Sequence, residues 1–260
     1  MNILLLLFYT LLIMSYHIQK VSTSLQSLLK HKKVLVCGDG DFSFSKALSA
    51  LGLHRQLIST TLDNKESLSN HFPQSVTNIK IIESVSINNK VLYNIDATKL
   101  MFPNEFDIIL WNFPHIIGKA NIRYNRELLR LFLNSALPCL TPYTGRVVCA
   151  LCGGQSGLEA KDKIEWDRSW KLPNQAAEAG MIITDKFNFD YDFFSNLGYI
   201  QQGHRGYGIY TYILCTIICN MIYNTYTIYY TYRRWIRFER IYGICLVIWS
   251  HQSPPCSPPC

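Results

Sequence analysis

The chain has 260 residues, of which 48% are apolar and 17% are charged. This composition excludes a disordered chain, and the length allows one domain of about 150–200 residues with extensions at its ends. The formal net charge of +7 permits contact with RNA but does not by itself indicate it.

Residues 1–30 form a hydrophobic N-terminal extension. Its run "ILLLLFYTLLIM", residues 3–14, resembles the central region of a signal peptide. No positively charged start precedes the run, no A-x-A cleavage site follows it, and it is too short to span a bilayer. A weak signal or anchor therefore stays open beside two alternatives, a helix packed on the domain and an artefact of the assigned start site.

From residue 33 onward, segments typical of strands alternate with segments typical of helices. The strand segments are apolar runs that end in polar or glycine residues, and the helix segments carry apolar residues three and four positions apart. Such alternation predicts an α/β fold with a mainly parallel sheet and flanking helices. We expect strands at residues 33–37, 57–63, 90–96, 106–115, 145–154 and 181–189, and helices at residues 42–51, 64–72, 125–140 and 175–180.

The segment "KVLVCGDGDFSFS" joins the first strand to the first helix. Gly38 and Gly40 allow a tight turn and the close approach of a ligand, and the following helix start offers free N–H groups. A dinucleotide-binding turn would have a third glycine where Ser43 stands, and Asp39 and Asp41 would repel its pyrophosphate. The two carboxylates instead favour a cationic ligand, so S-adenosylmethionine, with its sulfonium and ammonium groups, fits better than NAD. In the alternative interpretation, Asp41 only caps the helix.

Two further acids end the second and the third expected strand. Asp63 could accept both ribose hydroxyl groups of the cofactor, and Asp96, followed by Ala97, could hold the adenine amino group. In parallel sheets, ligands bind at the carboxyl ends of the strands, near the switch in strand order. Each acid alone is more often a solvated loop residue. Together, on successive strand ends after a glycine-rich first turn, the two acids indicate a cofactor site.

At these motifs the chain resembles a known family, the 25S rRNA (uridine-N3)-methyltransferases. The resemblance is carried by "GDGDFSFSKAL", "STTLD", "NIDATKL", "FDIILWNFPHIIGKANIRYNRELLRLFLNSA" and "GYIQQGHRGYG". The segment "VVCALCGGQSGLEAKDKIEWDRSWKLPNQAAEAGMIITDKF" is closer to an animal branch, the ferredoxin-fold anticodon-binding domain-containing proteins, whose N-terminal half is such a domain. The resemblance covers about residues 31–208, which we interpret as the methyltransferase-like domain.

The resemblance implies a Rossmann-like class I fold, S-adenosylmethionine as cofactor and methylation of a uridine N3 in large-subunit rRNA. It also implies cofactor contacts along the family's G-E-G-D-F-S-F turn. In this chain the positions concerned are Gly38, Asp39 (in the place of the family's Glu), Gly40, Asp41, Phe42 and Ser43. The family's N-F-P-H motif is intact at residues 112–115, whereas "CGGQSGLEAKDK" replaces the family's glycine-containing segment after the fifth strand.

The N-F-P-H motif carries the residues that we expect to act on the base. Methyl transfer from a sulfonium is an in-line displacement that needs orientation and a competent nucleophile but no metal. N3 of uridine carries a proton at neutral pH, so we predict that His115 accepts it, that Asn112 hydrogen-bonds the base edge and that Phe113 stacks on the ring. Two alternatives stay open: His115 caps a backbone carbonyl, and Phe113 packs in the core.

Basic residues follow this motif. Arg123, Arg126 and Arg130 have helical spacing, so they share a face that could meet phosphates or be solvated. We expect the partner to be rRNA or another structured RNA. The rival hypothesis is a catalytically inactive, methyltransferase-like module that binds RNA or protein.

The chain has nine cysteines, and two of them, Cys149 and Cys152, form a C-x-x-C pair inside an apolar run. No second C-x-x-C or His pair completes a zinc set at the usual spacing. We therefore expect buried, reduced thiols and no metal site.

Residues 209–260 are unlike the rest of the chain. Tyr, Ile and Thr dominate the first part, arginines cluster at residues 233–240, and the end "SPPCSPPC" is of low complexity. Residues 209–230 are long enough for a membrane helix but have no amphipathic period. We interpret this Tyr/Ile-rich tail as a gene-model artefact in preference to a membrane segment. We expect the domain to fold without residues beyond about 210, apart from a possible last strand near residues 207–213. We expect it to act in the cytoplasm or nucleolus, with membrane association only if the hydrophobic ends are genuine.

Overall fold

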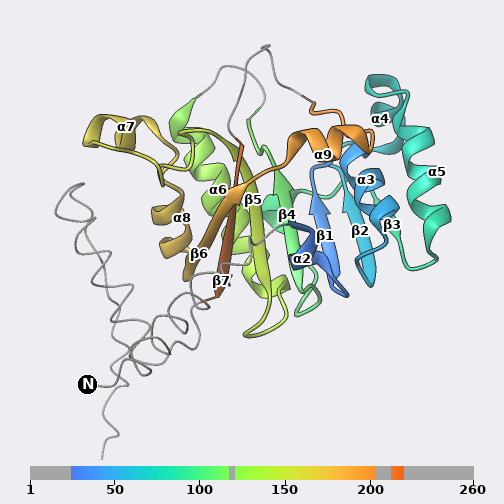
Figure 1. Cartoon of the computed structure of the whole chain (residues 1–260), viewed down its shortest axis with the longest axis horizontal. Coiled ribbons are helices and arrows are strands. Elements are labelled where there is room, and N and C mark those ends of the chain that lie inside the picture. Colours follow the sequence, from blue (N-terminus) through green and yellow to red (C-terminus); the bar gives the residue numbers. More distant parts are fainter. Residues whose placement is uncertain (1–24, 117–120, 203–211, 220–260) are drawn as a thin grey trace, which may run out of the picture.

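A computed structural model describes residues 25–116, 121–202 and 212–219 of the chain (Figure 1). Its centre is a seven-stranded sheet with the strand order β3-β2-β1-β4-β5-β7-β6. The first five strands in this order pair in parallel, whereas β7 pairs antiparallel with both of its neighbours. The strands are β1 (Lys33–Cys37), β2 (Gln56–Thr60), β3 (Lys90–Leu92), β4 (Ile108–Asn112), β5 (Arg146–Cys152), β6 (Met181–Asn188) and β7 (Tyr212–Cys219).

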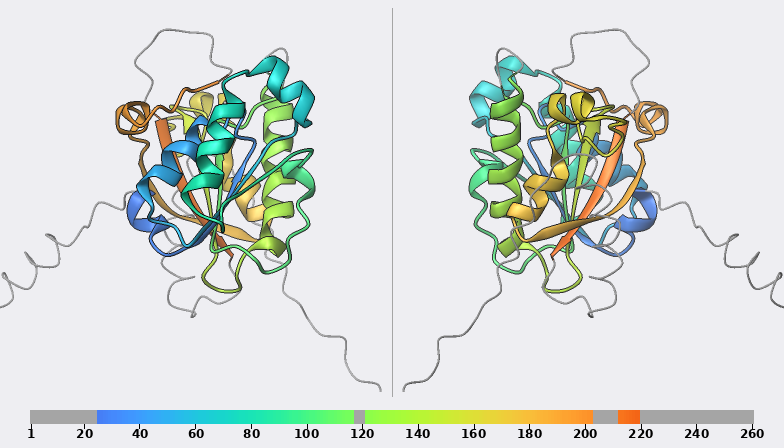
Figure 2. Two further views of the ribbon diagram at one scale, coloured as in Figure 1. Left: turned by 90° about the vertical axis from the view of Figure 1, so that its right-hand side faces the viewer. Right: turned by 90° about the vertical axis from the view of Figure 1, so that its left-hand side faces the viewer.

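Helices cover both faces of the sheet, as the two side views in Figure 2 show. They are α2 (Leu25–Leu29), α3 (Ser43–Leu51), α4 (Lys65–His71), α5 (Ser75–Val85), α6 (Ile122–Ala136), α7 (Lys163–Arg168), α8 (Leu172–Glu178) and α9 (Tyr191–Asn196), with short 3-10 helices η1 (Ala97–Lys99) and η2 (Leu137–Cys139). Because side chains alternate along a strand, Val34 and Val36 of β1 pack with α2, α3 and α5, whereas Leu35 and Cys37 pack with α6 and α8. The domain therefore has three layers and two hydrophobic cores.

The expected α/β fold with a mainly parallel sheet is confirmed, and all six expected strands and four expected helices are present. Several strands are shorter than expected because their polar last residues bend into loops. For example, β2 ends at Thr60 and leaves Asp63 outside the strand. The helices α5, α7 and α9 were not expected from the sequence.

The strand β7 overturns the expectation that the domain ends at residue 208. It lies between β5 and β6 and pairs with β5 over residues 212–218 and with β6 over residues 213–219. Its isoleucines, threonine and tyrosine are typical strand residues, which is why this part of the tail enters the sheet. A membrane helix over residues 209–230 is therefore wrong where β7 stands. The rest of the tail lies outside the described residues.

The domain also begins earlier than residue 31. Leu25 and Leu29 of α2 are buried in the same core as Val34 and Val36 of β1, so the end of the expected N-terminal extension belongs to the domain. Residues 1–24, which hold the apolar run, lie outside the described residues. Among the helices that the structure describes, none has the length and apolar character needed to cross a bilayer.

Candidate functional site

The glycine turn and the N-F-P-H motif lie side by side. Gly38 follows β1 and Phe113 follows β4, and these strands are parallel neighbours with Cys37 opposite Trp111. From β1 the chain adds β2 and β3 on one side and then returns to add β4 on the other. This is the switch in strand order at which open α/β sheets bind their ligands.

Hydrogen bonds between backbone groups hold the neighbouring strand-end loops together. The Asp39 N–H donates to the Thr60 carbonyl at 3.0 Å, which joins the glycine turn to the end of β2. The Asn94 N–H donates to the Asp63 carbonyl at 3.1 Å, which joins the loops after β2 and β3. The structure thus brings together the segments in which the sequence places the cofactor contacts.

The two glycines of the turn differ in what surrounds them. Gly38 has a φ of +59°, and a Cβ added to it would lie 2.7 Å from Nε1 of Trp111. A Cβ on Gly40 would lie 3.7 Å from Gln202 and 3.8 Å from Phe72, which is ordinary van der Waals contact. The packing of the protein itself therefore requires a glycine at position 38, whereas position 40 could hold a Cβ in van der Waals contact with its neighbours.

Asp39 is a buried carboxylate at the start of α3. Its Oδ2 accepts a hydrogen bond from the Ser45 N–H at 2.7 Å. Burial raises the pKa of Asp39 to about 6, although the hydrogen bonds from Ser45 act against this rise. A carboxylate in such surroundings would be stabilised by a cationic ligand.

The Asp41 carboxylate is buried and fully engaged within the protein. Its Oδ1 accepts from the Ser43 N–H at 2.9 Å, and its Oδ2 accepts from the side-chain amides of Gln74 at 3.3 Å and Gln202 at 2.8 Å. The first of these bonds holds the start of α3, in line with the capping alternative. A direct contact between Asp41 and a cofactor stays a prediction.

Phe42 and Ser43 also serve the packing of the protein. Phe42 is fully buried and has a φ of +60°, a conformation that a bulky residue rarely adopts. The Ser43 hydroxyl donates to the Ile200 carbonyl at 3.2 Å and accepts from the Ile200 N–H at 3.0 Å. Any cofactor contact of these two residues would therefore have to come from their backbone.

Asp63 is half-buried and only partly engaged. Its Oδ1 accepts from the Ser67 hydroxyl at the long distance of 3.4 Å. Its other carboxylate oxygen accepts from no residue in the part of the chain that the structure describes. Asp63 is thus free to accept ligand hydroxyl groups.

Asp96 begins η1, and its Oδ1 accepts from both the N–H and the hydroxyl of Thr98, at 2.8 and 2.7 Å. Its Oδ2 lies 3.5 Å from Nζ of Lys99. Ala97 is buried, and its carbonyl accepts from the Ser135 hydroxyl at 3.1 Å. The expected contact of Asp96 and Ala97 with adenine remains a prediction, and Asp96 additionally caps a helix.

Asn112 is the last residue of β4, beside the glycine turn. Both polar atoms of its side chain, Nδ2 and Oδ1, are buried, and neither has a hydrogen-bond partner in the described structure. A buried polar group without a partner costs about 1–3 kcal/mol. Such an amide is poised to gain from a ligand that offers both a donor and an acceptor.

Phe113 and His115 make the contacts of the two alternatives given above, in which Phe113 packs in the core and His115 caps a backbone carbonyl. Phe113 has a φ of +51°, and its ring packs edge-to-face on Phe189 with centroids 5.7 Å apart. His115 is exposed, and its Nδ1 lies 3.0 Å from the Phe113 carbonyl oxygen. Because a carbonyl oxygen can only accept, Nδ1 carries the proton and Nε2 is left as an acceptor in the neutral ring.

The three arginines of the expected basic face of α6 differ in their contacts. Arg126 donates to the backbone carbonyls of Asp167 and Ser169, each at 2.7 Å, and so ties α6 to the segment after α7. Arg130 pairs with a glutamate of its own helix. The Arg123 side chain is exposed and makes no hydrogen bond or ion pair with a described residue; its backbone N–H donates to Oδ1 of Asn121 at 3.0 Å. One arginine of the three is thus free to meet phosphates.

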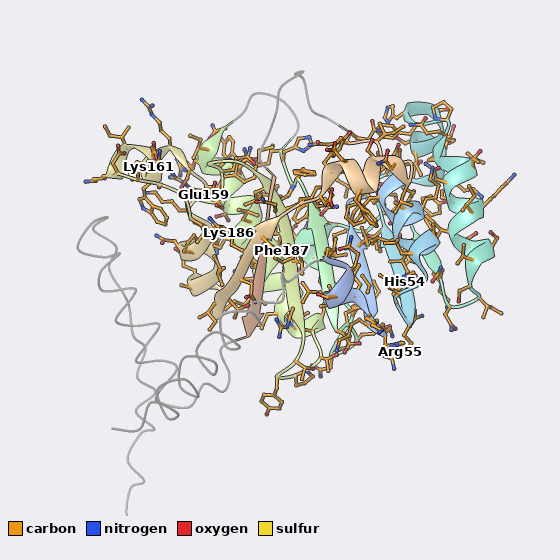
Figure 3. All side chains as sticks on the ribbon, viewed as in Figure 1. His54, Arg55, Glu159, Lys161, Lys186 and Phe187 are labelled. Atoms are coloured by element: carbon orange, nitrogen blue, oxygen red, sulfur yellow. The ribbon has the colours of Figure 1, made fainter. Side chains whose placement is uncertain are left out.

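The loop after β5, which departs from the family's pattern, is firmly attached to the domain. Glu159 accepts from Nζ of Lys186 on β6 at 3.1 Å, and Figure 3 shows the two side chains next to each other. The Trp170 N–H donates to the Gln155 carbonyl at 2.6 Å. The loop therefore has a defined conformation of its own beside the candidate site.

Six cysteines lie in the described ranges, and the four whose side chains are described are reduced thiols. Cys37, Cys139 and Cys149 are buried, and Cys152 is half-buried, with a pKa that burial raises. The expectation of reduced thiols is confirmed for these four residues. No group of three or more His, Cys, Asp and Glu side chains among the described residues could hold a metal ion.

The sequence did not reveal the partners of the turn, namely Trp111, Gln74 and Gln202. Gln202 belongs to the segment "GYIQQGHRGYG" that carries part of the resemblance, but it lies 161 positions from Asp41. No local pattern predicts a contact over that separation.

The sheet has β7 inserted antiparallel between β5 and β6, and the glycine turn and the acids lie at its strand ends. Together these features define the Rossmann-like class I S-adenosylmethionine-dependent methyltransferase fold. Residues 35–202 match the family described as "BMT5-like: rRNA (uridine-N3-)-methyltransferase BTM5-like". This match covers well over half of the chain, so the chain belongs to that family. The resemblance noted from the motifs is confirmed.

The chain is similar to several known proteins. It is 35% identical over 181 residues to ferredoxin-fold anticodon-binding domain-containing protein 1 of Homo sapiens, covering 67% of this chain but 28% of that protein. The mouse homolog, from Mus musculus, is 32% identical over the same length. The chain therefore corresponds to less than a third of the length of these relatives. A solved 16S rRNA methyltransferase, KamB, has a TM-score of 0.46 and 13% identity, with 74% of this chain and 90% of that chain covered.

Proposed function

We propose that this chain is an S-adenosylmethionine-dependent methyltransferase that modifies N3 of a uridine in large-subunit rRNA, in the cytoplasm or nucleolus. Beyond the family membership, the observation that carries the proposal is the buried, unpaired amide of Asn112 beside the glycine turn. Nδ2 of Asn112 can donate to one of the carbonyl oxygens that flank N3 of uridine. The base would then be fixed next to the place where the cofactor is expected.

The residues around the turn fit the proposed cofactor. Asp63 has a carboxylate oxygen without a partner among the described residues, which could accept from the ribose hydroxyl groups, and the buried Asp39 gains from a cation. Asp96 lies at the next strand end, where the adenine amino group is expected. When bound, the cofactor supplies an electrophilic methyl group on a sulfonium.

His115 is the proposed proton acceptor. Its Nδ1–H is held by the Phe113 carbonyl, so the neutral ring presents the Nε2 lone pair. Nε2 would accept the proton that N3 of uridine gives up when the methyl group is transferred to it. The hydrogen bond at Nδ1 orients the ring and selects the tautomer that can accept this proton.

The second candidate is a non-catalytic module that binds RNA or protein through the same fold. It is favoured by the side chains of Asp41 and Ser43, whose hydrogen bonds are satisfied by the protein itself. The two candidates differ in whether the domain binds the cofactor.

Calorimetry with S-adenosylmethionine decides between them, since the non-catalytic module is not expected to bind it. Transfer of labelled methyl to ribosomal RNA, followed by nucleoside analysis, then tests the reaction. We expect His115→Ala to lower the rate roughly 10²–10⁴-fold with unchanged cofactor affinity. His54→Ala is the control, because His54 precedes β2 at the opposite edge of the sheet (Figure 3). Full activity of His115→Ala, or label on ribose or carbon, would contradict the assigned chemistry.

A further inference from the structure

Three separate segments of the chain meet at the Asp41 carboxylate. Its Oδ1 binds the start of α3 through the Ser43 N–H, whereas its Oδ2 accepts from Gln74, just before α5, and from Gln202, after α9. Asp41 is only 1% exposed, so its charge depends on these donors and not on water. The bond from Gln202, at 2.8 Å, is shorter than the 3.3 Å bond from Gln74.

The segment that carries Gln202 runs along the glycine turn. The ring of Tyr199 lies edge-on to Phe44 of α3, with centroids 5.3 Å apart. Ile200 exchanges two hydrogen bonds with the Ser43 hydroxyl. The stem of Gln202 lies 3.7 Å from the position that a Cβ on Gly40 would occupy. Residues 199–202 thus form one wall of the turn, and the Gln202 amide fixes that wall to Asp41.

We infer that Gln202 is a positioning residue for the cofactor turn, acting through Asp41. The inference rests on the proposed function, since the turn matters only if it binds S-adenosylmethionine. Its physical basis is the buried charge: without the Gln202 donor, the Asp41 carboxylate lacks its shortest side-chain hydrogen bond and the turn loses its attachment to residues 199–202. The part of the chain after β6 thereby sets the affinity for the cofactor.

Gln202→Ala tests this inference, with Gln201→Ala as the matched control at the neighbouring, equally half-exposed position. We expect Gln202→Ala to raise the Kd and the KM for S-adenosylmethionine roughly tenfold, which corresponds to the loss of one hydrogen bond to a charged group. kcat and the KM for RNA should stay unchanged. Amide hydrogen exchange of residues 38–45 should become faster. Gln201→Ala should resemble the wild type in each measurement.

The pH dependence of cofactor affinity in Gln202→Glu distinguishes the positioning role of Gln202 from a purely structural one. A carboxylate at this position repels Asp41 when ionised, but its protonated form can again donate to Asp41. Cofactor affinity of Gln202→Glu should therefore be low at pH 8 and recover toward the wild-type value as the pH falls to 6. Asp39 lies in the same turn and has a pKa of about 6, so the wild type and Gln201→Glu define the background pH dependence.

Two outcomes overturn the inference. One is unchanged hydrogen exchange of residues 38–45 in Gln202→Ala. The other is equal cofactor affinity of Gln202→Ala and Gln201→Ala. A wild-type chain that binds no S-adenosylmethionine would instead overturn the proposed function, and the exchange measurement would still decide whether Gln202 positions the turn.

Discussion

At the scale of single residues, Gly38 and Gly40 stand two positions apart in one turn and yet are glycines for different reasons. Gly38 combines a positive φ with contact to the Trp111 indole, whereas Gly40 has ordinary space around it. Gly38→Ala should therefore destabilise the domain by about 1–3 kcal/mol, through backbone strain and the clash with Trp111. Denaturant unfolding measures this change.

Gly40→Ala is the partner variant in the same experiment. Its added Cβ meets no atom closer than 3.7 Å, so the free energy of unfolding should change by less than about 0.5 kcal/mol. Calorimetry should nevertheless find weaker cofactor binding if the ligand approaches the backbone at this position. Equal destabilisation by both variants would contradict the packing described for the turn.

The raised pKa of Asp39 predicts how stability depends on pH. The folded-state pKa of about 6 lies above the ordinary value of 3.8, so the folded chain binds the proton more tightly than the unfolded chain. The stabilising effect of this proton is fully present below about pH 4 and is lost as the pH rises through 6. Over this range the wild type should lose about 3 kcal/mol relative to Asp39→Asn.

Asp39→Asn keeps an oxygen that can accept from the Ser45 N–H, so it isolates the effect of the charge. Unfolding of both proteins should be measured at pH 3.5 and at pH 7, on either side of this range. A difference between the two proteins that does not change with pH would show that the Asp39 carboxylate is not destabilised by burial. A bound cation would lower the pKa of Asp39, so cofactor affinity should rise over the same pH range.

At the scale of secondary-structure elements, two arginines of α6 that the sequence places on one basic face have different roles: Arg126 is structural, and Arg123 is available for RNA. Arg126→Ala removes donors to the carbonyls of Asp167 and Ser169 and should destabilise the domain by about 1–2 kcal/mol. Arg123→Ala should leave stability within about 0.5 kcal/mol, because the exposed Arg123 side chain makes no hydrogen bond or ion pair with a described residue.

RNA binding at several salt concentrations completes this comparison. If Arg123 contacts a phosphate, Arg123→Ala should weaken binding and lower the slope of log K against log salt by about one. The structural role of Arg126 predicts little change in that slope for Arg126→Ala, measured where the variant is folded. A lower slope for Arg126→Ala and an unchanged slope for Arg123→Ala would show that Arg126, and not Arg123, contacts the RNA.

The elements themselves differ in how far the sequence predicts them. The strands β1, β4 and β5 are continuous apolar runs because both of their faces are buried, and such runs are visible without a structure. The helix α5 has a weaker signal, since its segment is rich in β-branched residues and its buried face includes Ser75 and Asn78.

The candidate site, too, is only partly predictable from the sequence. The sequence predicts which residues stand at strand ends, because each strand end is marked locally by a glycine, an acid or the N-F-P-H motif. It does not predict where their side chains point. Phe113 packs on Phe189 and Asp41 binds Gln202, and both contacts join segments that are far apart in the chain. Such contacts depend on the packing of the whole domain.

At the scale of the whole molecule, the sheet depends on a strand from the part of the chain that looks least like a folded domain. β7 is the neighbour of both β5 and β6, so a chain that stops before it leaves β6 without a partner and β5 as an exposed, apolar edge. Exposed apolar edge strands promote association between chains. The dependence on β7 replaces the expectation that residues beyond about 210 are dispensable.

A chain that ends at residue 211 should therefore unfold without a cooperative transition or aggregate, whereas a chain that ends at residue 219 should unfold cooperatively, because it keeps all seven strands. Thermal unfolding followed by circular dichroism, together with light scattering, distinguishes the two. Cooperative unfolding of the shorter chain would mean that β5 and β6 close the sheet without β7. In that case the domain boundary would return to residue 208. Loss of cooperativity in both chains would instead place further core residues beyond residue 219.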